Sequence, residues 1–162
     1  MKAAVLTVSD RVSRGEAADS SGPAAAEMLA ELGFEVVGVR VVADGIESVS
    51  AALEALLPLA NLIVTTGGTG FSARDVTPEA TSGVIERPAP GLAEAMRAAT
   101  FGKNPHGMLA RGVAGIAGSS LIVNLPGSER AVRESLAVIA PALHHAVELL
   151  VEPHSDHNVA GN

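Results

Sequence analysis

The sequence predicts an α/β fold: a three-layer sandwich with a mainly parallel sheet, helices on both faces and an antiparallel edge strand. Short β-rich apolar runs alternate with segments whose apolar residues recur at helical spacing, and this alternation predicts right-handed crossovers between parallel strands. The 162 residues, 48% of them hydrophobic, fit one compact domain with a sizeable core. We expect that single domain over residues 1–151 and a mobile C-terminal tail over residues 152–162, where the chain becomes polar.

The first half of the chain follows the order strand, helix, strand, helix, strand. The predicted segments are residues 2–8, 21–32, 34–42, 46–57 and 62–64. Pro23 suits the first turn of a helix and Gly33 suits the end of one, because proline has a helical φ and glycine accepts the left-handed conformation that follows many helices. Pro58 ends the second helix.

The second half is expected to contain two helices, a hairpin of two strands and a closing helix. The predicted segments are residues 78–85, 91–100, 111–117, 120–125 and 128–151. Gly118 joins the two strands of the hairpin, which carries the antiparallel edge strand of the sheet. Pro141 lies inside the closing helix and is expected to kink or break it near Ala140.

The composition excludes several classes of function. The formal net charge is −7 and no basic cluster interrupts it, which argues against nucleic-acid binding. No run of about 18 apolar residues is free of charge, so no membrane span is expected. The first residues have the pattern of a strand rather than of a signal peptide, which favours a cytoplasmic location. The chain has no cysteine, so thiolate zinc sites and cysteine nucleophiles are excluded.

The segment LIVTTGGTGFSARDVTPEA, residues 62–80, is the strongest functional signal. It combines a buried strand, a loop with three glycines, one acid and a helix start. Glycines let backbone N–H groups approach a ligand closely, and a helix N-terminus adds positive potential, so the expected ligand is a phosphate. A carboxylate beside a phosphate is repelled unless a cation lies between them, so Asp75 indicates Mg²⁺ or a polar substrate group. The glycine spacing matches neither a Walker loop nor the dinucleotide fingerprint.

Two further loops belong at the same edge of the sheet. Asp44 ends the second strand, and residues 124–128 follow another strand, with Ser128 placed to cap the last helix. Each has a purely structural interpretation as well, an Asp-Gly turn and a capped turn. Because parallel strands place their carboxyl ends at one edge, where ligands of open α/β sheets bind, these loops and the glycine loop predict a single crevice.

Other polar and aromatic side chains have ordinary structural interpretations. Ser20 or Ser21 is expected to cap the first long helix through its side chain. His144 and His145 are expected on the surface of the last helix. Phe71 could stack on a flat heterocycle, but packing against its own loop is the favoured interpretation. The pattern G-x-S-x-G does not occur, so a hydrolase triad with a nucleophile elbow is disfavoured.

The chain resembles the molybdopterin adenylyltransferase family of molybdenum cofactor biosynthesis, the Mog and MoaB type proteins. The resemblance covers essentially the whole domain and is carried by DSSGP at 19–23, TTGGTG at 65–70, RDVTPEAT at 74–81, PG at 90–91 and NLPGS at 124–128. It implies a molybdopterin-binding-like fold, usually a homotrimer or a dimer of trimers, that binds molybdopterin and ATP and transfers AMP to the phosphate of the pterin. One departure is Ala110 before Arg111, where the family pattern has a serine.

The resemblance also implies roles for individual residues. Asp75 and Asp44 correspond to the two acids of the family, expected in catalysis and in holding Mg²⁺. Binding of the substrates is expected from residues of the loops and of the helix start: Thr66, Gly67, Gly68, Thr69, Gly70, Thr77, Pro78, Glu79, Asn124, Pro126, Gly127 and Ser128. The product would be handed over to a molybdenum-inserting protein.

Three other functions remain compatible with these residues. The first is a pterin-binding carrier of the same fold that lacks adenylyl transfer. The second is a molybdate-insertion domain, which normally belongs to a much longer chain. The third is a nucleotide-binding domain with an unrelated substrate, because the glycine loop by itself indicates only affinity for an anion.

Overall fold

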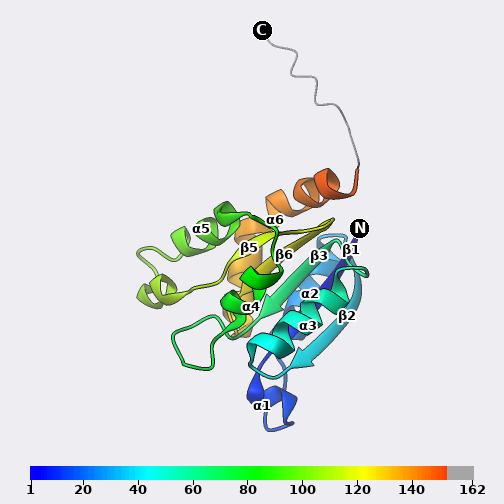
Figure 1. Cartoon of the computed structure of the whole chain (residues 1–162). Helices are drawn as coiled ribbons and strands as arrows, with labels where there is room; N and C mark the ends of the chain where they lie inside the picture. The colour runs from blue at the N-terminus through cyan, green and yellow to red at the C-terminus, as the bar shows by residue number, and fades with distance from the viewer. Residues whose placement is uncertain (153–162) are drawn as a thin grey trace.

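The computed structural model describes residues 1–152 and contains one sheet in the order β2-β1-β3-β6-β5-β4 (Figure 1). The strands are β1 Lys2–Val8, β2 Glu35–Val42, β3 Leu62–Thr66, β4 Arg87–Pro88, β5 Ala114–Ala117 and β6 Ser120–Leu125. Strands β2, β1, β3 and β6 are mutually parallel, whereas β5 is antiparallel to β6 and β4 is antiparallel to β5. The predicted class, a mainly parallel sheet with an antiparallel edge, is confirmed.

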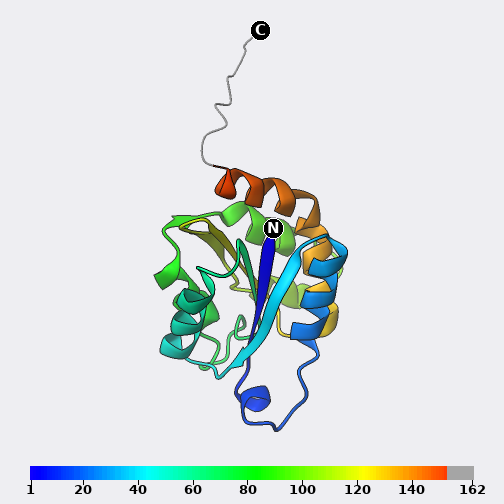
Figure 2. The ribbon, with the colours of Figure 1, turned by 90° about the vertical axis from the view of Figure 1, so that its right-hand side faces the viewer.

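Helices cover both faces of this sheet and complete the three layers (Figure 2). The helices are α1 Asp10–Ser13, α2 Ser21–Glu31, α3 Ile46–Leu56, α4 Thr77–Val84, α5 Pro90–Ala98, the 3₁₀ helix η1 Pro105–Leu109, and α6 Glu129–Val151. Helices α2, α5 and α6 pack on one face, and α3 and α4 pack on the other. The helix and strand bounds differ from the expected ones by at most three residues at each end, with the β4, α1 and η1 segments as additions.

The central strands are buried on both faces, which explains their nearly continuous apolar sequence. Along β1, Ala3 and Val5 join the core under α2 and α6, while Ala4 and Leu6 join the core under α3. Successive side chains of a strand point to opposite faces, so one strand supplies both cores. The edge strand β2 is different: Val37, Val39 and Val41 are partly exposed, so an alternating pattern appears only there.

The closing helix α6 behaves as a core helix with a proline inside it. Both ribbon views show α6 changing direction along its length, in agreement with the kink expected from Pro141. Among the described residues α6 is the one helix long and apolar enough to cross a membrane by length and composition. Its Val132, Leu136 and Leu143 are completely buried under the sheet, which is typical of the core helix of a globular domain.

The parallel strands end together at the lower end of the molecule in Figure 1, close to α1. Register pairs Val8 of β1 with Val42 of β2, and Thr66 of β3 with Leu125 of β6. The loops that follow these four strands therefore begin side by side, as the topology rule predicts. The tail expected over residues 152–162 lies outside the described residues, apart from Glu152.

Candidate functional site

A cavity of about 270 Å³ opens where these loops meet. Its walls come from the segments that follow β1, β2, β3 and β6, together with the start of α2. The lining residues are Thr7, Val8, Ser9, Val12, Ala18, Asp19, Ser20, Ser21, Asp44, Gly67, Gly68, Asp75 and Gly127. Five residues expected at the site are among them: Asp44, Asp75, Gly67, Gly68 and Gly127. The sequence-predicted crevice at this edge of the sheet therefore exists as a cavity.

Gly67 and Gly68 make a turn that no other residue could make without strain. Their φ angles are +90° and +64°, in the left-handed region that side chains with a Cβ rarely adopt. A Cβ at Gly67 would lie 2.3 Å from the carbonyl oxygen of Val8, and one at Gly68 would lie 2.2 Å from Oγ1 of Thr77. The chain can thus pass close to β1 and α4 only because both side chains are absent.

Thr77 fastens this turn to the start of α4. Its hydroxyl donates to the carbonyl oxygen of Gly67 at 2.9 Å, and its backbone N–H donates to the carbonyl oxygen of Gly68 at 3.0 Å. Thr77 and Pro78 are buried and do not line the cavity. In this structure Thr77 supports the glycine turn from behind, and the expected binding role of Thr77 and Pro78 stays a prediction.

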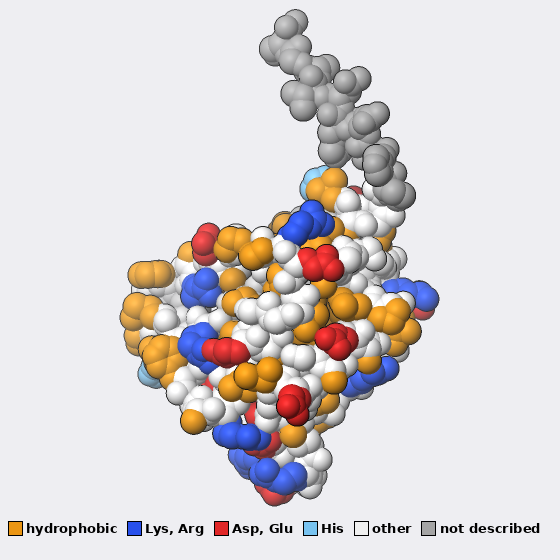
Figure 3. Space-filling model, in the orientation of Figure 1, with side chains coloured by type: hydrophobic (Ala, Val, Ile, Leu, Met, Phe, Trp, Pro, Cys, Tyr) orange, Lys and Arg blue, Asp and Glu red, His pale blue; other side chains and the backbone are white. Residues whose placement is uncertain are grey.

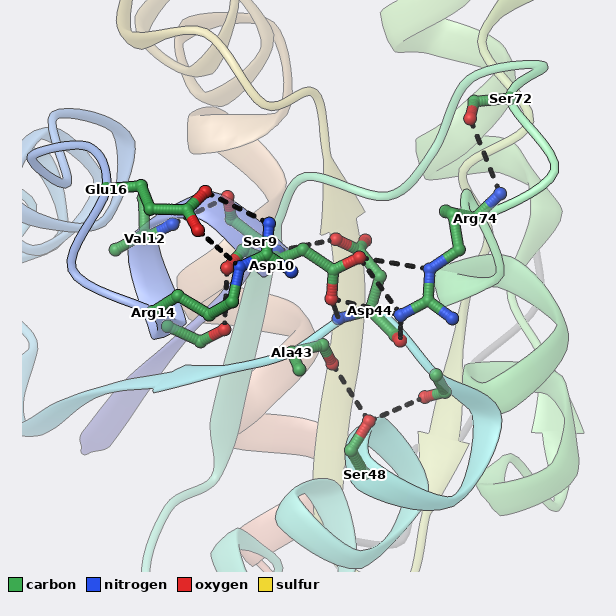
Figure 4. Close-up of polar contacts among 12 residues, drawn as sticks. Ser9, Asp10, Val12, Arg14, Glu16, Ala43, Asp44, Ser48, Ser72 and Arg74 are labelled. Carbon is green, nitrogen blue, oxygen red and sulfur yellow. Dashed lines mark hydrogen bonds and ion pairs between the residues drawn. The ribbon is translucent and has the colours of Figure 1, made fainter.

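Asp44 is held by a reciprocal pair of hydrogen bonds with Asp10 (Figure 4). The backbone N–H of Asp10 donates to Asp44 Oδ2 at 2.7 Å, and the backbone N–H of Asp44 donates to Asp10 Oδ1 at 3.1 Å. Asp44 Oδ1 accepts no hydrogen bond within residues 1–152, and it lies 3.1 Å from the position of a Cβ on Gly68. One oxygen of Asp44 is therefore fixed by the backbone and the other is available to a ligand.

Asp75, like Asp44, has one carboxylate oxygen that is hydrogen-bonded to the backbone and one that is not. Its Oδ2 accepts the backbone N–H of Ser72 at 2.8 Å, which closes a tight turn before α4. Its Oδ1 has no hydrogen-bond partner in the part of the chain that the structure describes. Both acids at the cavity thus keep one free carboxylate oxygen each.

Asp19 is a third acid in the cavity wall, but both of its carboxylate oxygens already accept hydrogen bonds from the protein. Oδ1 accepts from the backbone N–H of Gly22 at 2.9 Å and from the Ser21 hydroxyl at 3.3 Å, and Oδ2 accepts from the Thr7 hydroxyl at 2.7 Å. Asp19 therefore caps α2. The expectation that Ser20 or Ser21 supplies this cap was wrong: Ser20 makes no side-chain cap bond, and the Ser21 hydroxyl pairs with Thr66 Oγ1 at 2.8 Å.

Arg111 crosses from the segment before β5 to clamp the glycine loop. Its guanidinium donates to the carbonyl oxygens of Gly70 and Asp75 and forms an ion pair with Glu79, while its backbone N–H donates to Thr69 O. The hydrogen bond from Arg111 lowers the pKa of Glu79 below its ordinary value. Glu79 thus points to Arg111 and, like Thr69 and Gly70, lies outside the cavity lining.

The segment 124–128 contributes mainly structure. The Asn124 amide is buried and donates to the hydroxyls of Thr65 and Thr81 at 2.9 Å each, and its oxygen accepts the backbone N–H of Val113 at 3.2 Å. Ser128 caps α6 by accepting from Ala131, as its sequence position predicts. Asn124, Pro126 and Ser128, expected to form a wall, are not in the cavity lining, and Gly127 alone of this segment is.

The structure corrects the expected positions of Phe71 and His144. Phe71 is 70% exposed and does not pack against its own loop. His144 is half-buried rather than on the surface, because its ring stacks on Phe34 with centroids 4.5 Å apart and contacts the carbonyl oxygen of Leu32. His145 is exposed, as expected.

The side chains that line the cavity carry negative charge, whereas a simple anion pocket carries positive side chains. Three carboxylates line the cavity, and none of its lining residues is a lysine or arginine. The positive groups that it offers are backbone N–H groups: those of Ser20, Gly68 and Gly127 donate no hydrogen bond within residues 1–152. An anionic ligand therefore needs a cation to neutralise the acids.

The donor set fits Mg²⁺ better than a metal with an all-protein cage. No group of three or more Asp, Glu, His or Cys side chains in residues 1–152 is arranged to hold a metal ion by itself. Mg²⁺ is commonly bound by one or two carboxylates together with substrate phosphates. Asp44 and Asp75 each offer one free carboxylate oxygen of this kind at the cavity.

Comparison with known proteins identifies the family of the chain. A family model described as a probable molybdopterin binding domain matches residues 4–145. The chain belongs to this molybdopterin-binding family. The resemblance noted in the sequence is thereby confirmed.

Three members of the family illustrate the extent of the likeness. A gephyrin of Dictyostelium discoideum is 41% identical over 157 residues, which cover 90% of this chain but 22% of the gephyrin, so the chain spans only part of that relative's length. A molybdopterin adenylyltransferase of Helicobacter pylori is 39% identical over 91% of this chain and 86% of its own. The molybdopterin biosynthesis enzyme MoaB from Thermus thermophilus is 44% identical in sequence. Its crystal structure matches this one with a TM-score of 0.87, and the match covers 92% of this chain and 95% of that chain.

Proposed function

We propose that this chain is a molybdopterin adenylyltransferase of molybdenum cofactor biosynthesis, which transfers AMP from ATP to the phosphate of molybdopterin in the presence of Mg²⁺. The observation that carries the proposal is the meeting of a double-glycine turn with two half-free carboxylates, Asp44 and Asp75, in one cavity. The name of the Helicobacter pylori relative, which matches nearly the full length, supports the reaction.

The residues suit a reaction that depends on positioning rather than on a general base. An oxygen of the pterin phosphate forms a bond to the α-phosphorus of ATP, the bond from that phosphorus to the bridging oxygen breaks, and pyrophosphate leaves with the electron pair. The attacking phosphate monoester is already ionised near neutral pH, so no proton has to be removed. This agrees with a cavity lined by acids and glycines, without a histidine or lysine.

The chain's own groups would bind and orient the reacting phosphates. The unpaired N–H groups of Gly68, Ser20 and Gly127 come from three loops and can contact phosphate oxygens from different sides. Asp44 and Asp75 would hold Mg²⁺, which when bound neutralises phosphate charge and stabilises the departing pyrophosphate. The guanidinium of Arg111 donates to carbonyl oxygens of the loop that carries Asp75. Its hydrogen bonds therefore go to the protein and not to a substrate.

The decisive experiment is incubation of the chain with molybdopterin, ATP and Mg²⁺, followed by mass analysis for adenylylated pterin. Removal of Mg²⁺ by a chelator should stop the reaction. Retention of pterin without transfer of AMP would contradict the proposal and favour a carrier.

Replacement of Asp75 tests the role of the acid. Asp75→Asn should lower turnover by about a hundredfold or more, with little loss of pterin binding, because a neutral amide cannot neutralise a bound cation. Glu134→Gln is the matched control, since Glu134 is an exposed acid paired with Arg130 on α6. An unchanged rate in Asp75→Asn would exclude this role.

We further propose a homotrimer or a dimer of trimers in the cytoplasm. The exposed side chains of Phe101, Met108 and Leu109 near η1 support a subunit interface, because contiguous apolar surface of this kind marks contacts. The gephyrin relative, in which a matching unit is part of a longer chain, supports hand-over of the product to a molybdenum-inserting partner. Light scattering after size-exclusion chromatography tests the assembly: a monomer would contradict it.

A further inference from the structure

Arg74 is the residue through which the loops after three different strands are joined. It lies at the exposed tip of the loop that follows β3, next to Asp75. Its guanidinium donates from Nε to Asp10 Oδ2 and from Nη2 to Asp10 Oδ1, each at 3.0 Å. It also donates to the backbone carbonyl oxygen of Asp44. Asp10 follows β1 and Asp44 follows β2, so one side chain spans all three segments (Figure 4).

The two acids of the cavity depend on this junction in different ways. Asp44 takes its orientation from the backbone of Asp10, whose side chain is in turn held by Arg74. Asp75 is adjacent to Arg74 in the chain, at the end of a loop whose residues 71–74 are exposed and contribute no side chain to either core. Arg111 holds the base of that loop at Gly70 and Asp75, and Arg74 holds its tip.

We propose that Arg74 and Asp10 form a positioning pair that holds the loop of Asp75 against the loop of Asp44 and so sets the relative placement of the two acids. The inference rests on the proposed function for its effect on turnover, but the pairing itself is a structural claim. The bidentate geometry matches the fork of a guanidinium to a carboxylate, which gives direction as well as attraction. Neither side chain needs to touch a substrate.

Ion pairing alone does not join these loops, because another ion pair in the same region has no contact with Asp44 or Asp75. Figure 3 shows charged side chains of both signs gathered at the lower end of the molecule. Arg14 and Glu16, between α1 and α2, form an ion pair of similar length, 2.8 Å, yet neither side chain contacts Asp44 or Asp75. Glu16→Gln is therefore the matched control: it removes an exposed ion pair of the same region without touching the loops after β2 and β3.

The test compares Arg74→Gln, Asp10→Asn, the double variant and Glu16→Gln in the full chain. Asp10→Asn keeps the backbone N–H that donates to Asp44 Oδ2, and its one remaining carbonyl oxygen can still accept the backbone N–H of Asp44, so its main effect is loss of the charged bidentate contact with Arg74. Limited chymotrypsin cleavage after Phe71, which is 70% exposed on this loop, reports the order of the loop. Cleavage after Leu59, 46% exposed in the turn between α3 and β3, is the internal reference.

Either single variant should raise the rate of cleavage after Phe71 about fivefold and leave cleavage after Leu59 unchanged. Turnover should fall about tenfold, while the KM for ATP changes by less than about twofold, because binding groups stay and their alignment is lost. The double variant should match the worse single variant, since the two residues act as one unit. Arg74→Lys should recover part of both effects, and Glu16→Gln should match the wild type.

Wild-type cleavage in Arg74→Gln or Asp10→Asn would overturn the proposal, even with a lower turnover, because the residue would then act without holding the loop. Effects of the two substitutions that multiply in the double variant would overturn it as well. If the wild-type chain transfers no AMP at all, the proposed function fails, and the cleavage measurements still decide whether the pair holds the loop.

Discussion

Gly67→Ala should destabilise the fold more than any other single-methyl addition in the glycine loop that leaves the acids in place. Gly67 is buried at the end of β3: its φ is +90°, and a Cβ would lie 2.3 Å from the carbonyl oxygen of Val8 in the neighbouring strand. The obstacle is backbone rather than the end of a flexible side chain, so rotation of a side chain cannot relieve it.

The magnitude follows from two costs. An alanine in this region of φ costs about 1–2 kcal/mol. Displacement of β1, which is buried on both faces, adds about 1–3 kcal/mol. The expected loss is about 3 kcal/mol, which corresponds to a fall of about 6–12 °C in Tm for a domain of this size.

Urea unfolding followed by circular dichroism measures the change, with the midpoint falling by about 1.5 M at an m value of about 2 kcal/mol/M. Gly83→Ala is the control, because Gly83 lies in α4 with no atom within 4 Å of an added Cβ. That variant should be unchanged or more stable by up to about 1 kcal/mol, since alanine favours a helix. A Gly67→Ala protein within about 1 kcal/mol of the wild type would refute the reasoning.

The remaining predictions concern the polar contacts around the cavity. Asn124→Ala should lower the free energy of unfolding by about 2–4 kcal/mol in urea, because two buried threonine hydroxyls and one backbone N–H lose their partner; a loss below about 1 kcal/mol would contradict it. Arg111→Met should lower turnover about tenfold by releasing the loop of Asp75, whereas Arg130→Met on the exposed face of α6 should not. Hydrogen bonds from arginines hold the pKa of Asp10 below 3.8 and that of Glu79 below 4.5, so both pairs stabilise the fold above these values and lose their contribution as the pH falls through the lowered pKa. Carboxyl NMR titration should show both shifts, and Arg111→Met should return Glu79 alone to its ordinary range.

Much of this architecture is readable from local sequence. Apolar periodicity placed every long helix and strand because burial on a helix stripe or on both strand faces imposes a repeat on the residues. The short strand β4 was not predicted, because its two residues, Arg87 and Pro88, are too few to show a periodic pattern. The convergence of Asp44 and the glycine loop was also predictable, since it needs only the rule that parallel strands end together.

The roles of individual polar side chains were decided by tertiary structure. Asp19 was placed before the first long helix, and two of its three hydrogen bonds are local, but the one that occupies its second oxygen, and hence its difference from Asp44 and Asp75, depends on Thr7 in β1. Asn124 has the motif of a binding residue and the contacts of a structural one. A sequence motif records that a residue type is required, and it does not say whether a ligand or the protein itself requires it.

By itself, then, the sequence determined the three layers and the edge of the sheet at which the loops after the parallel strands meet, because these follow from short-range periodicity and from topology. Only the tertiary structure decided which acids keep a free oxygen and which arginines hold their loops. Arg74 reaches a residue 64 positions away and Arg111 one 41 positions away. Such pairings leave no local pattern, because the contact arises only when the strands between them have folded.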